Sequence, residues 1–246
     1  EFNDAPDEAM AAAENEQAGE IDLADDTKAP GGVYTIKSAG DHKFTCKKSP
    51  ETSNRIVVDG TNTSEQDNIN IYLNKVNINT SAGSALQIKR NVKATVTIHL
   101  TGTNSLITKD NRCAGLQKDN EAQLIITSAS DATAGVLNAS SDSGAGIGGS
   151  DRESCSNITI NGGSVTASSE WGAGIGGGEG GSCSNITING GSVNARSTDS
   201  GAGIGGGSGG SGSNITINSG SVTASSTDGA GIGGGLYGSC GNITIN

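Results

Sequence analysis

Basic residues and two aromatic residues are the side chains of this 246-residue chain best suited to contact a ligand. Twelve of the 14 lysines and arginines in residues 31–246 precede Asp119, which predicts a positive face on the first part of this region. Such a face attracts carboxylate-rich polymers such as polyuronates, although lysines also protect sheet edges from aggregation. Trp171 and Tyr237 stand at expected corners, where exposed rings can stack on sugars. The candidate ligand-binding residues are Lys89, Arg90, Lys93, Lys109, Arg112, Lys118, Trp171 and Tyr237.

Four acidic residues precede repeated copies of a Gly-Ala-Gly-Ile turn, namely Asp142, Glu170, Asp199 and Asp228. If the copies stack, these like charges repel by about 1 kcal/mol per pair even in water. Bound Ca²⁺ would relieve this repulsion, because calcium takes several oxygen ligands, main-chain carbonyls included. The four residues are therefore a candidate calcium site, and the alternative is a set of solvated corner acids.

Cys155 and Cys183 occupy the same place in adjacent copies of the repeat. Stacked neighbours lie about 4.8 Å apart, which is within the Cα range of a disulfide. Cys240 would lie two copies from Cys183, at roughly 9.6 Å, which is too far to bridge. Cys155 and Cys183 are thus a disulfide candidate, the alternative being a stack of half-buried thiols.

The remaining polar residues do not form a catalytic pattern. His42 and His99 lie far apart, and the chain has no Ser/His/Asp arrangement and no Cys-x-x-Cys motif. The Gly-x-Gly-Ile-Gly-Gly turn is no phosphate loop, because it recurs in every copy and no helix is expected after it. We expect no enzyme activity, and with a net charge of −11 we expect no nucleic-acid partner.

The elements that position these residues follow from an internal repeat. Gly144, Gly172, Gly201 and Gly229 open similar segments that lie 28, 29 and 28 residues apart, a period typical of solenoids. Within a copy, segments such as Ile158-Thr-Ile alternate apolar and polar residues, which predicts short strands. Three strands per copy predict an all-β right-handed parallel β-helix with about 28–31 residues per coil.

The same pattern extends toward the N-terminus in a less regular form, which predicts six full coils and a partial seventh. Residues 1–30 hold ten acidic residues against one lysine, so we expect a disordered acidic linker there. We expect the β-helix over 31–246, with an N-terminal cap at 31–54, irregular coils at 55–143 and regular coils at 144–246. The last coil is incomplete, which favours a fragment, with end-to-end self-association as the alternative. One apolar column is predicted to contain Ile56, Leu86, Leu116, Ile147, Ile175, Ile204 and Ile232.

The order of motifs carries a family resemblance. Residues 54–60 (Asn-Arg-Ile-Val-Val-Asp-Gly), 71–78 (Ile-Tyr-Leu-Asn-Lys-Val-Asn-Ile) and 95–106 precede the repeated Gly-Ala-Gly-Ile-Gly-Gly and Asn-Ile-Thr-Ile-Asn-Gly-Gly-Ser-Val. Residues 31–246 thereby resemble β-helical cell-surface proteins of clostridia, and are similar in layout to a carbohydrate-binding β-helix family of cellulolytic clostridia. The resemblance implies extracellular, non-catalytic binding of plant polysaccharide, including polygalacturonate, with calcium. Where that family often carries an Asp inside the Gly-x-Gly-Ile turn, this chain has Ala145, Ala173, Ala202 and Ala230.

Three roles agree with these observations. The first is an extracellular bacterial surface or secreted module that binds acidic plant or host polysaccharide, or acts as an adhesin. The second is a structural stalk of a larger surface adhesin, because a repeated surface carries little address information. The third is ice binding through an outward ladder of threonines. That ladder consists of Thr159, Thr187, Thr216 and Thr244. The sequence shows no signal peptide and no membrane span.

Overall fold

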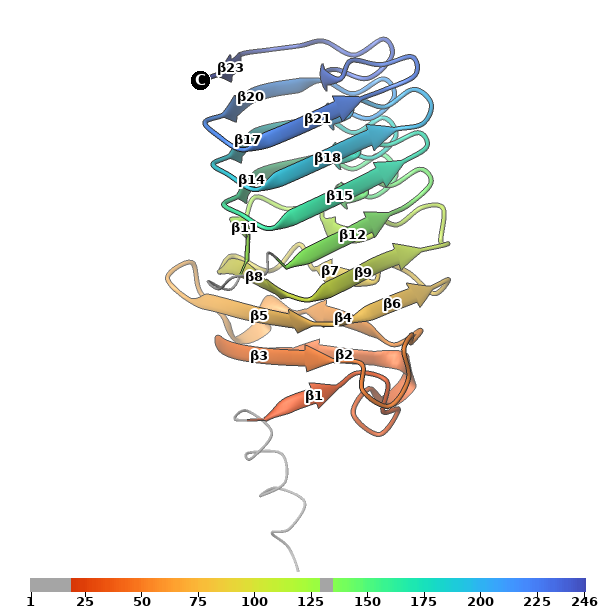
Figure 1. Cartoon of the computed structure of the whole chain (residues 1–246), viewed down its shortest axis with the longest axis vertical. Helices are drawn as coiled ribbons and strands as arrows, with labels where there is room; N and C mark the ends of the chain where they lie inside the picture. The colour runs from red at the N-terminus through yellow and green to blue at the C-terminus, as the bar shows by residue number, and fades with distance from the viewer. Residues whose placement is uncertain (1–18, 129–134) are drawn as a thin grey trace, which may run out of the picture.

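The computed structural model describes residues 19–128 and 135–246 and winds them into a parallel β-solenoid (Figure 1). Each full coil contributes one strand to each of three parallel sheets, here called sheets A, B and C. The coils stack along the long axis of the molecule, with the first coil and the last coil at opposite ends (Figure 1). This three-sheet architecture confirms the predicted β-helix class. The expected linker residues 1–18 lie outside the described residues.

The strands of each sheet follow one another in chain order. Sheet A consists of β1 (Glu20–Asp22), β3 (Gly40–Thr45), β5 (Asn68–Asn74), β8 (Thr95–Thr101), β11 (Leu124–Ser128), β14 (Cys155–Ile160), β17 (Cys183–Ile188), β20 (Gly212–Ile217) and β23 (Ile243–Ile245). Sheet B consists of β2 (Val33–Ile36), β4 (Arg55–Val58), β7 (Leu86–Ile88), β10 (Leu116–Lys118), β13 (Ile147–Gly148), β16 (Ile175–Gly176), β19 (Ile204–Gly205) and β22 (Ile232–Gly233). Sheet C consists of β6 (Asn77–Thr80), β9 (Thr103–Thr108), β12 (Val136–Ser140), β15 (Ser164–Ser169), β18 (Ser192–Ser197) and β21 (Ser221–Ser225). Short 3₁₀ turns span Pro30–Gly32 and Gly60–Asn62.

The core is a set of apolar columns along the solenoid axis. In sheet B, Ile56 pairs with Leu86, and the same register continues through the predicted column to Ile232. Alternation along each strand sends every second side chain inward, so Ile71 and Ile98 of sheet A are fully buried on adjacent strands. Burying such a side chain contributes roughly 1.5–3 kcal/mol. The predicted apolar column is therefore confirmed residue by residue.

Glycines make the corner that leaves sheet B. Gly148, Gly176, Gly205 and Gly233 occupy one column with φ between 134° and 146°, a region that side chains rarely adopt. A Cβ atom on Gly176 would lie 1.8 Å from the carbonyl oxygen of Gly205 in the next coil. The coils can therefore approach to sheet spacing here only because these positions lack side chains.

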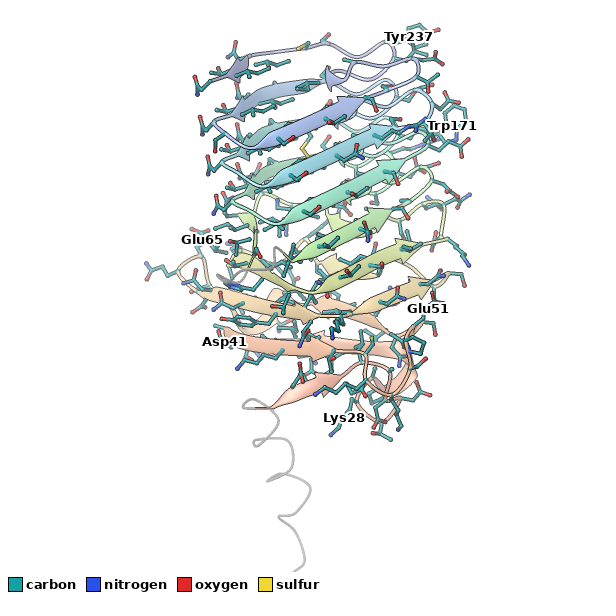
Figure 2. The ribbon with its side chains drawn as sticks, in the orientation of Figure 1. Lys28, Asp41, Glu51, Glu65, Trp171 and Tyr237 are labelled. Atoms are coloured by element: carbon teal, nitrogen blue, oxygen red, sulfur yellow. A yellow bond between two sulfur atoms is a disulfide. The ribbon has the colours of Figure 1, made fainter. Side chains whose placement is uncertain are left out.

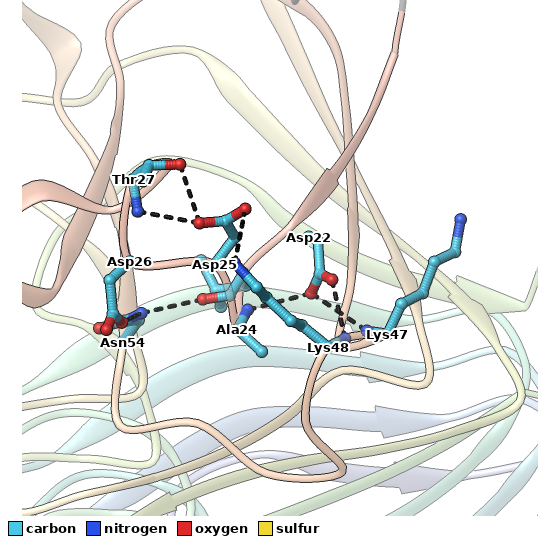
Figure 3. Close-up of polar contacts among 9 residues, drawn as sticks. Asp22, Ala24, Asp25, Asp26, Thr27, Lys47, Lys48 and Asn54 are labelled. Carbon is cyan, nitrogen blue, oxygen red and sulfur yellow. Dashed lines mark hydrogen bonds and ion pairs between the residues drawn. The ribbon is translucent and has the colours of Figure 1, made fainter.

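The solenoid begins earlier than predicted, so the boundary at residue 30 is wrong. β1 pairs with β3, and its Ile21 is buried, as is Leu23 directly after it. The acidic side chains around these two residues form polar contacts with residues of the next coil (Figure 3). The Asp22 carboxylate accepts hydrogen bonds from the backbone N–H groups of Ala24 (3.1 Å), Lys47 (3.0 Å) and Lys48 (2.8 Å).

Residues 31–54 supply ordinary rungs in place of a separate cap. β2 pairs with β4, and β3 pairs with β5, so sheet B has eight strands where the sequence predicted seven rungs. Phe44 is fully buried, and the Tyr34 ring meets it edge to face with ring centroids 5.1 Å apart. The two rings thus pack together between sheets A and B of the first coils. Within the described residues, no helix has the length and hydropathy needed to cross a membrane.

Candidate functional site

The structure joins Cys155 and Cys183 in a disulfide between adjacent coils, with Cα atoms 4.7 Å apart. The two cysteines begin β14 and β17 and lie opposite each other in the register of sheet A. Gly212 and then Cys240 continue the column, so Cys240 lies two coils from Cys183 and remains an exposed thiol. The disulfide therefore links two of the regular coils covalently.

The predicted acidic residues stack at one corner, where backbone hydrogen bonds join each one to the next. The backbone N–H of Glu170 donates to the Asp142 carbonyl oxygen (3.0 Å), Asp199 donates to Glu170 (3.1 Å) and Asp228 donates to Asp199 (3.0 Å). We call these four residues the acidic column. Within the part of the chain that the structure describes, no group of three or more His, Cys, Asp or Glu residues is placed to hold a metal ion. Calcium binding at the acidic column stays a prediction.

The turns that lead from sheet B into sheet A form a groove on the early coils, which we call the corner groove. Three depressions of about 700, 510 and 690 Å³ lie here: Arg90 and Asp119 line the first two, and Lys93 lines the first and the third. Glu65 comes from the turn before β5, Arg90 and Lys93 from the turn before β8, and Asp119 from the turn before β11. Stacking of three successive turns thus assembles the groove from residues more than 50 positions apart.

Three of the predicted ligand-binding residues belong to this groove, and each faces a carboxylate. Lys89 pairs with Asp59 at 2.9 Å, Lys93 reaches Glu65 at 3.7 Å, and Arg90 pairs with Glu153. The side chains of Arg90 and Lys93 remain 64% and 67% exposed. The corner groove therefore presents two accessible cations whose ion pairs are open to water.

Lys109 and Arg112 lie outside the corner groove, because both follow β9 at the corner between sheets C and B. Lys109 lines a separate depression of about 340 Å³ together with Asp142 and Glu170 of the acidic column. Arg112 approaches Asp151 at 3.9 Å. The predicted basic face is thus divided between two corners.

The assignment of Lys118 to the ligand-binding surface is wrong, because this residue is fully buried. Lys118 pairs with Ile88, and Ile88 pairs with Val58, so the lysine occupies an inward position of sheet B. Its Nζ donates to the backbone carbonyls of Asn120 (2.8 Å) and Ser156 (2.6 Å). Burial lowers the pKa of this ammonium to about 8, which the nearby carboxylates oppose only in part.

Trp171 and Tyr237 stand on the side of the solenoid away from Glu65 of the corner groove (Figure 2). Trp171 is 37% exposed, and its carbonyl oxygen accepts a hydrogen bond from the N–H of Ser208 in the next coil (2.9 Å). Tyr237 is 92% exposed and has a left-handed backbone with φ of 63°. The structure therefore does not bring the two rings together with the early-coil cations.

A stacked pair of rings on sheet A was missed in the sequence. Tyr72 of β5 and His99 of β8 lie opposite each other, with ring centroids 4.4 Å apart and planes 11° from parallel. We call them the ring pair. Aligning the buried Ile71 with Ile98 would have found them, since the following residues must then pair on the outward face. The lining residues of the corner groove include no aromatic side chain, whereas the ring pair lies on strands β5 and β8.

The later coils present a different outward face on sheet A. The threonine column from Thr159 to Thr244 lies between two asparagine ladders in which amides bond from coil to coil. In one ladder, Asn189 donates to Asn161 (2.9 Å) and Asn218 donates to Asn189 (2.8 Å). These amides satisfy one another, so they offer a ligand few unpaired groups.

Comparison with known proteins supports the fold. The family described as "Beta helix repeat" matches residues 158–179, 186–208 and 215–236, three segments that fall in successive regular coils. No curated protein and no solved structure matches the chain. The three matched repeats agree with the three stacked sheets, which show a parallel β-helix built from repeated coils.

Proposed function

We propose that this protein is a non-catalytic extracellular module that binds acidic polysaccharide through the corner groove. The observation that carries the proposal is the placement of Arg90 and Lys93, exposed cations from one turn, along a groove that spans three coils. A polymer with a carboxylate on every sugar fits this groove, because Arg90 and Lys93 of one turn can pair with the carboxylates of neighbouring sugars.

The present ion pairs do not prevent this binding. Exposed ion pairs contribute about 0–1 kcal/mol, so a uronate carboxylate can replace Glu153 beside Arg90, or Glu65 beside Lys93, at low cost. Asp119 lines the same groove but is held internally, since it accepts from the N–H (2.8 Å) and hydroxyl (3.0 Å) of Ser150. The groove can therefore exchange its own carboxylates for those of a ligand.

The disulfide between Cys155 and Cys183 supports the extracellular part of the proposal. Disulfides form and persist mainly in oxidising compartments such as the outside of the cell. A bacterial surface location or secretion agrees with that chemistry.

The test is retention of the protein by polygalacturonate in affinity electrophoresis, with neutral dextran as the control polymer. We expect Arg90→Gln combined with Lys93→Gln to weaken retention about tenfold or more, since loss of two pairs of about 1 kcal/mol each exceeds the 1.4 kcal/mol of a tenfold change. Arg196→Gln, which removes an exposed cation from sheet C of a later coil, is the matched control and should bind as the wild type. Equal retention of all three proteins, or none of the wild type, would refute the proposal.

A structural stalk is the second candidate, favoured by the mutually bonded asparagine ladders of the later coils. The two roles separate on a glycan array. A stalk binds none of the acidic or neutral glycans, whereas a binding module is retained by at least one acidic polymer through Arg90 and Lys93.

A further inference from the structure

One acidic residue of the corner groove differs from the others in its contacts. Glu121 lies in the turn before β11, lines the depression of about 700 Å³ and is exposed. The other carboxylates of this depression have partners, since Glu65 reaches Lys93 at 3.7 Å and Asp119 accepts hydrogen bonds from Ser150. Among the residues that the structure describes, no cation forms an ion pair with Glu121.

The backbone around Glu121 is held by hydrogen bonds to both neighbouring coils. Its carbonyl oxygen accepts from the Asn157 amide of the next coil (2.7 Å). The carbonyl oxygen of the preceding Asn120 accepts from the Lys118 ammonium (2.8 Å), and the Asn120 amide donates to the Lys89 carbonyl oxygen of the coil before (2.9 Å). The groove wall that carries Glu121 is therefore fixed in place.

Glu121 and Lys93 occupy equivalent places in successive turns. Leu124 pairs with Val96, and each of them lies three residues after one of the two charged residues. Neighbouring rungs of a sheet lie about 4.8 Å apart. Lys93 nevertheless makes its ion pair with Glu65 of the turn before β5. A ligand carboxylate that replaces Glu65 beside Lys93 therefore lies one coil from a carboxylate that has no cation of its own.

The depression presents both signs of charge to one ligand. Its volume is in the range of pockets that hold small-molecule ligands, so a short sugar segment that fills it meets the cations and Glu121 together. Arg90 and Lys93 favour carboxylates. An ionised glutamate has only acceptor atoms, so Glu121 accepts hydrogen bonds from sugar hydroxyls and repels a uronate. The buried Lys118 ammonium does not take the place of a counter-ion here, because it donates to backbone carbonyls.

We propose that Glu121 is a specificity-determining residue of the corner groove, which favours a polyuronate whose carboxylates are interrupted by uncharged sugars. Arg90 and Lys93 bind carboxylates of the chain, and Glu121 accepts hydrogen bonds from the hydroxyls of an uncharged sugar one coil further along. A fully ionised polyuronate still binds through the two cations, but one of its carboxylates meets Glu121, and such a repulsive contact contributes to specificity. The inference rests on the proposed function and names the substrate class of the same groove.

The test compares fully ionised polygalacturonate with partly methyl-esterified polygalacturonate in affinity electrophoresis at low ionic strength. We expect the wild type to bind the two polymers within about twofold of each other, because esterification removes attraction at the cations and repulsion at Glu121 in similar measure. Glu121→Gln removes the charge but keeps the size of the side chain. This variant should bind polygalacturonate about fourfold more tightly than the wild type, as expected for one like-charge contact at rung spacing. Its affinity for the esterified polymer should change by less than about twofold.

Glu51→Gln is the matched control, because it removes the same charge from an exposed residue on the side of the solenoid away from Glu65 (Figure 2). It should bind both polymers as the wild type. An unchanged affinity of Glu121→Gln for polygalacturonate, or an equal gain with Glu51→Gln or with the esterified polymer, overturns the role of Glu121. The Arg90→Gln and Lys93→Gln double variant tests the groove itself, so the groove stands in that case if the double variant fails to bind. If the wild type binds neither polymer, both proposals fall.

Discussion

The buried lysine of sheet B predicts a rise in stability with pH. In the unfolded chain the Lys118 ammonium has its ordinary pKa of 10.5, and in the folded protein that pKa is about 8. Between these values the unfolded state binds the additional proton, so the free energy of unfolding increases as the pH rises. The linkage relation gives an increase of about 2 kcal/mol between pH 7 and pH 9.5.

The control is Lys118→Met, because the inward neighbours in the same column are the apolar Ile88 and Val58. Urea unfolding of both proteins at several pH values gives the difference between their free energies of unfolding, which cancels the titration of cysteines and tyrosines common to both. We expect that difference to move by about 2 kcal/mol in favour of the wild type from pH 7 to pH 9.5. Parallel pH profiles would show that the amine keeps its ordinary pKa in the fold, and would refute the reasoning.

Three further predictions concern the stability of the stacked coils. Gly176→Ala should lower the free energy of unfolding by about 3 kcal/mol or more, since the φ of Gly176 is 146° and the added Cβ would lie 1.8 Å from a backbone oxygen. The control is Gly162→Ala, whose Cβ would have its nearest neighbour at 3.9 Å. This substitution should change the free energy of unfolding by about 0.5 kcal/mol or less. Equal effects of the two substitutions in urea unfolding would contradict the stacking at this corner. Cys155→Ser should cost about 3.5 kcal/mol, the loop-closure value for a separation of 28 residues, and reductant should lower the melting temperature of the wild type but not of this variant. Chelation should lower the melting temperature if the acidic column holds calcium, and an unchanged value would remove that prediction.

The repeat pattern predicts most of the fold because one isoleucine per coil identifies the register of a whole sheet. Ile147, Ile175 and Ile204 pair as expected, and the disulfide column follows from the same alignment. The strand β1 was not predicted, because the many acidic residues around it indicated a disordered segment. Ile21 and Leu23 alternate with acidic residues as in a strand, but this alternation includes only two apolar residues. Backbone N–H groups of the second coil donate hydrogen bonds to an acidic side chain of this segment. The local sequence does not indicate these donors, because they lie about 25 residues further along the chain.

The candidate site was predicted less completely, for reasons of strand parity and register. Lys118 lies two residues after the buried Leu116, so alternation places it inward, yet lysine composition alone suggested a surface cation. Tyr72 and His99 meet only when two strands are aligned across a separation of 27 residues. Arg90 and Lys93 were identified from charge alone, whereas the groove beside them depends on three stacked turns.

The glycine column has a consequence for how such a chain can change. A methyl group on Gly176 would occupy space that belongs to the coil above it, so the residue tolerated at this corner is decided by the neighbouring coil as well as by its own. One coil therefore cannot diverge at this corner while its neighbours stay as they are. Copying a complete unit of 28 or 29 residues, by contrast, adds a coil that already satisfies both neighbours. An array of this kind gains or loses whole units more easily than it alters a single corner.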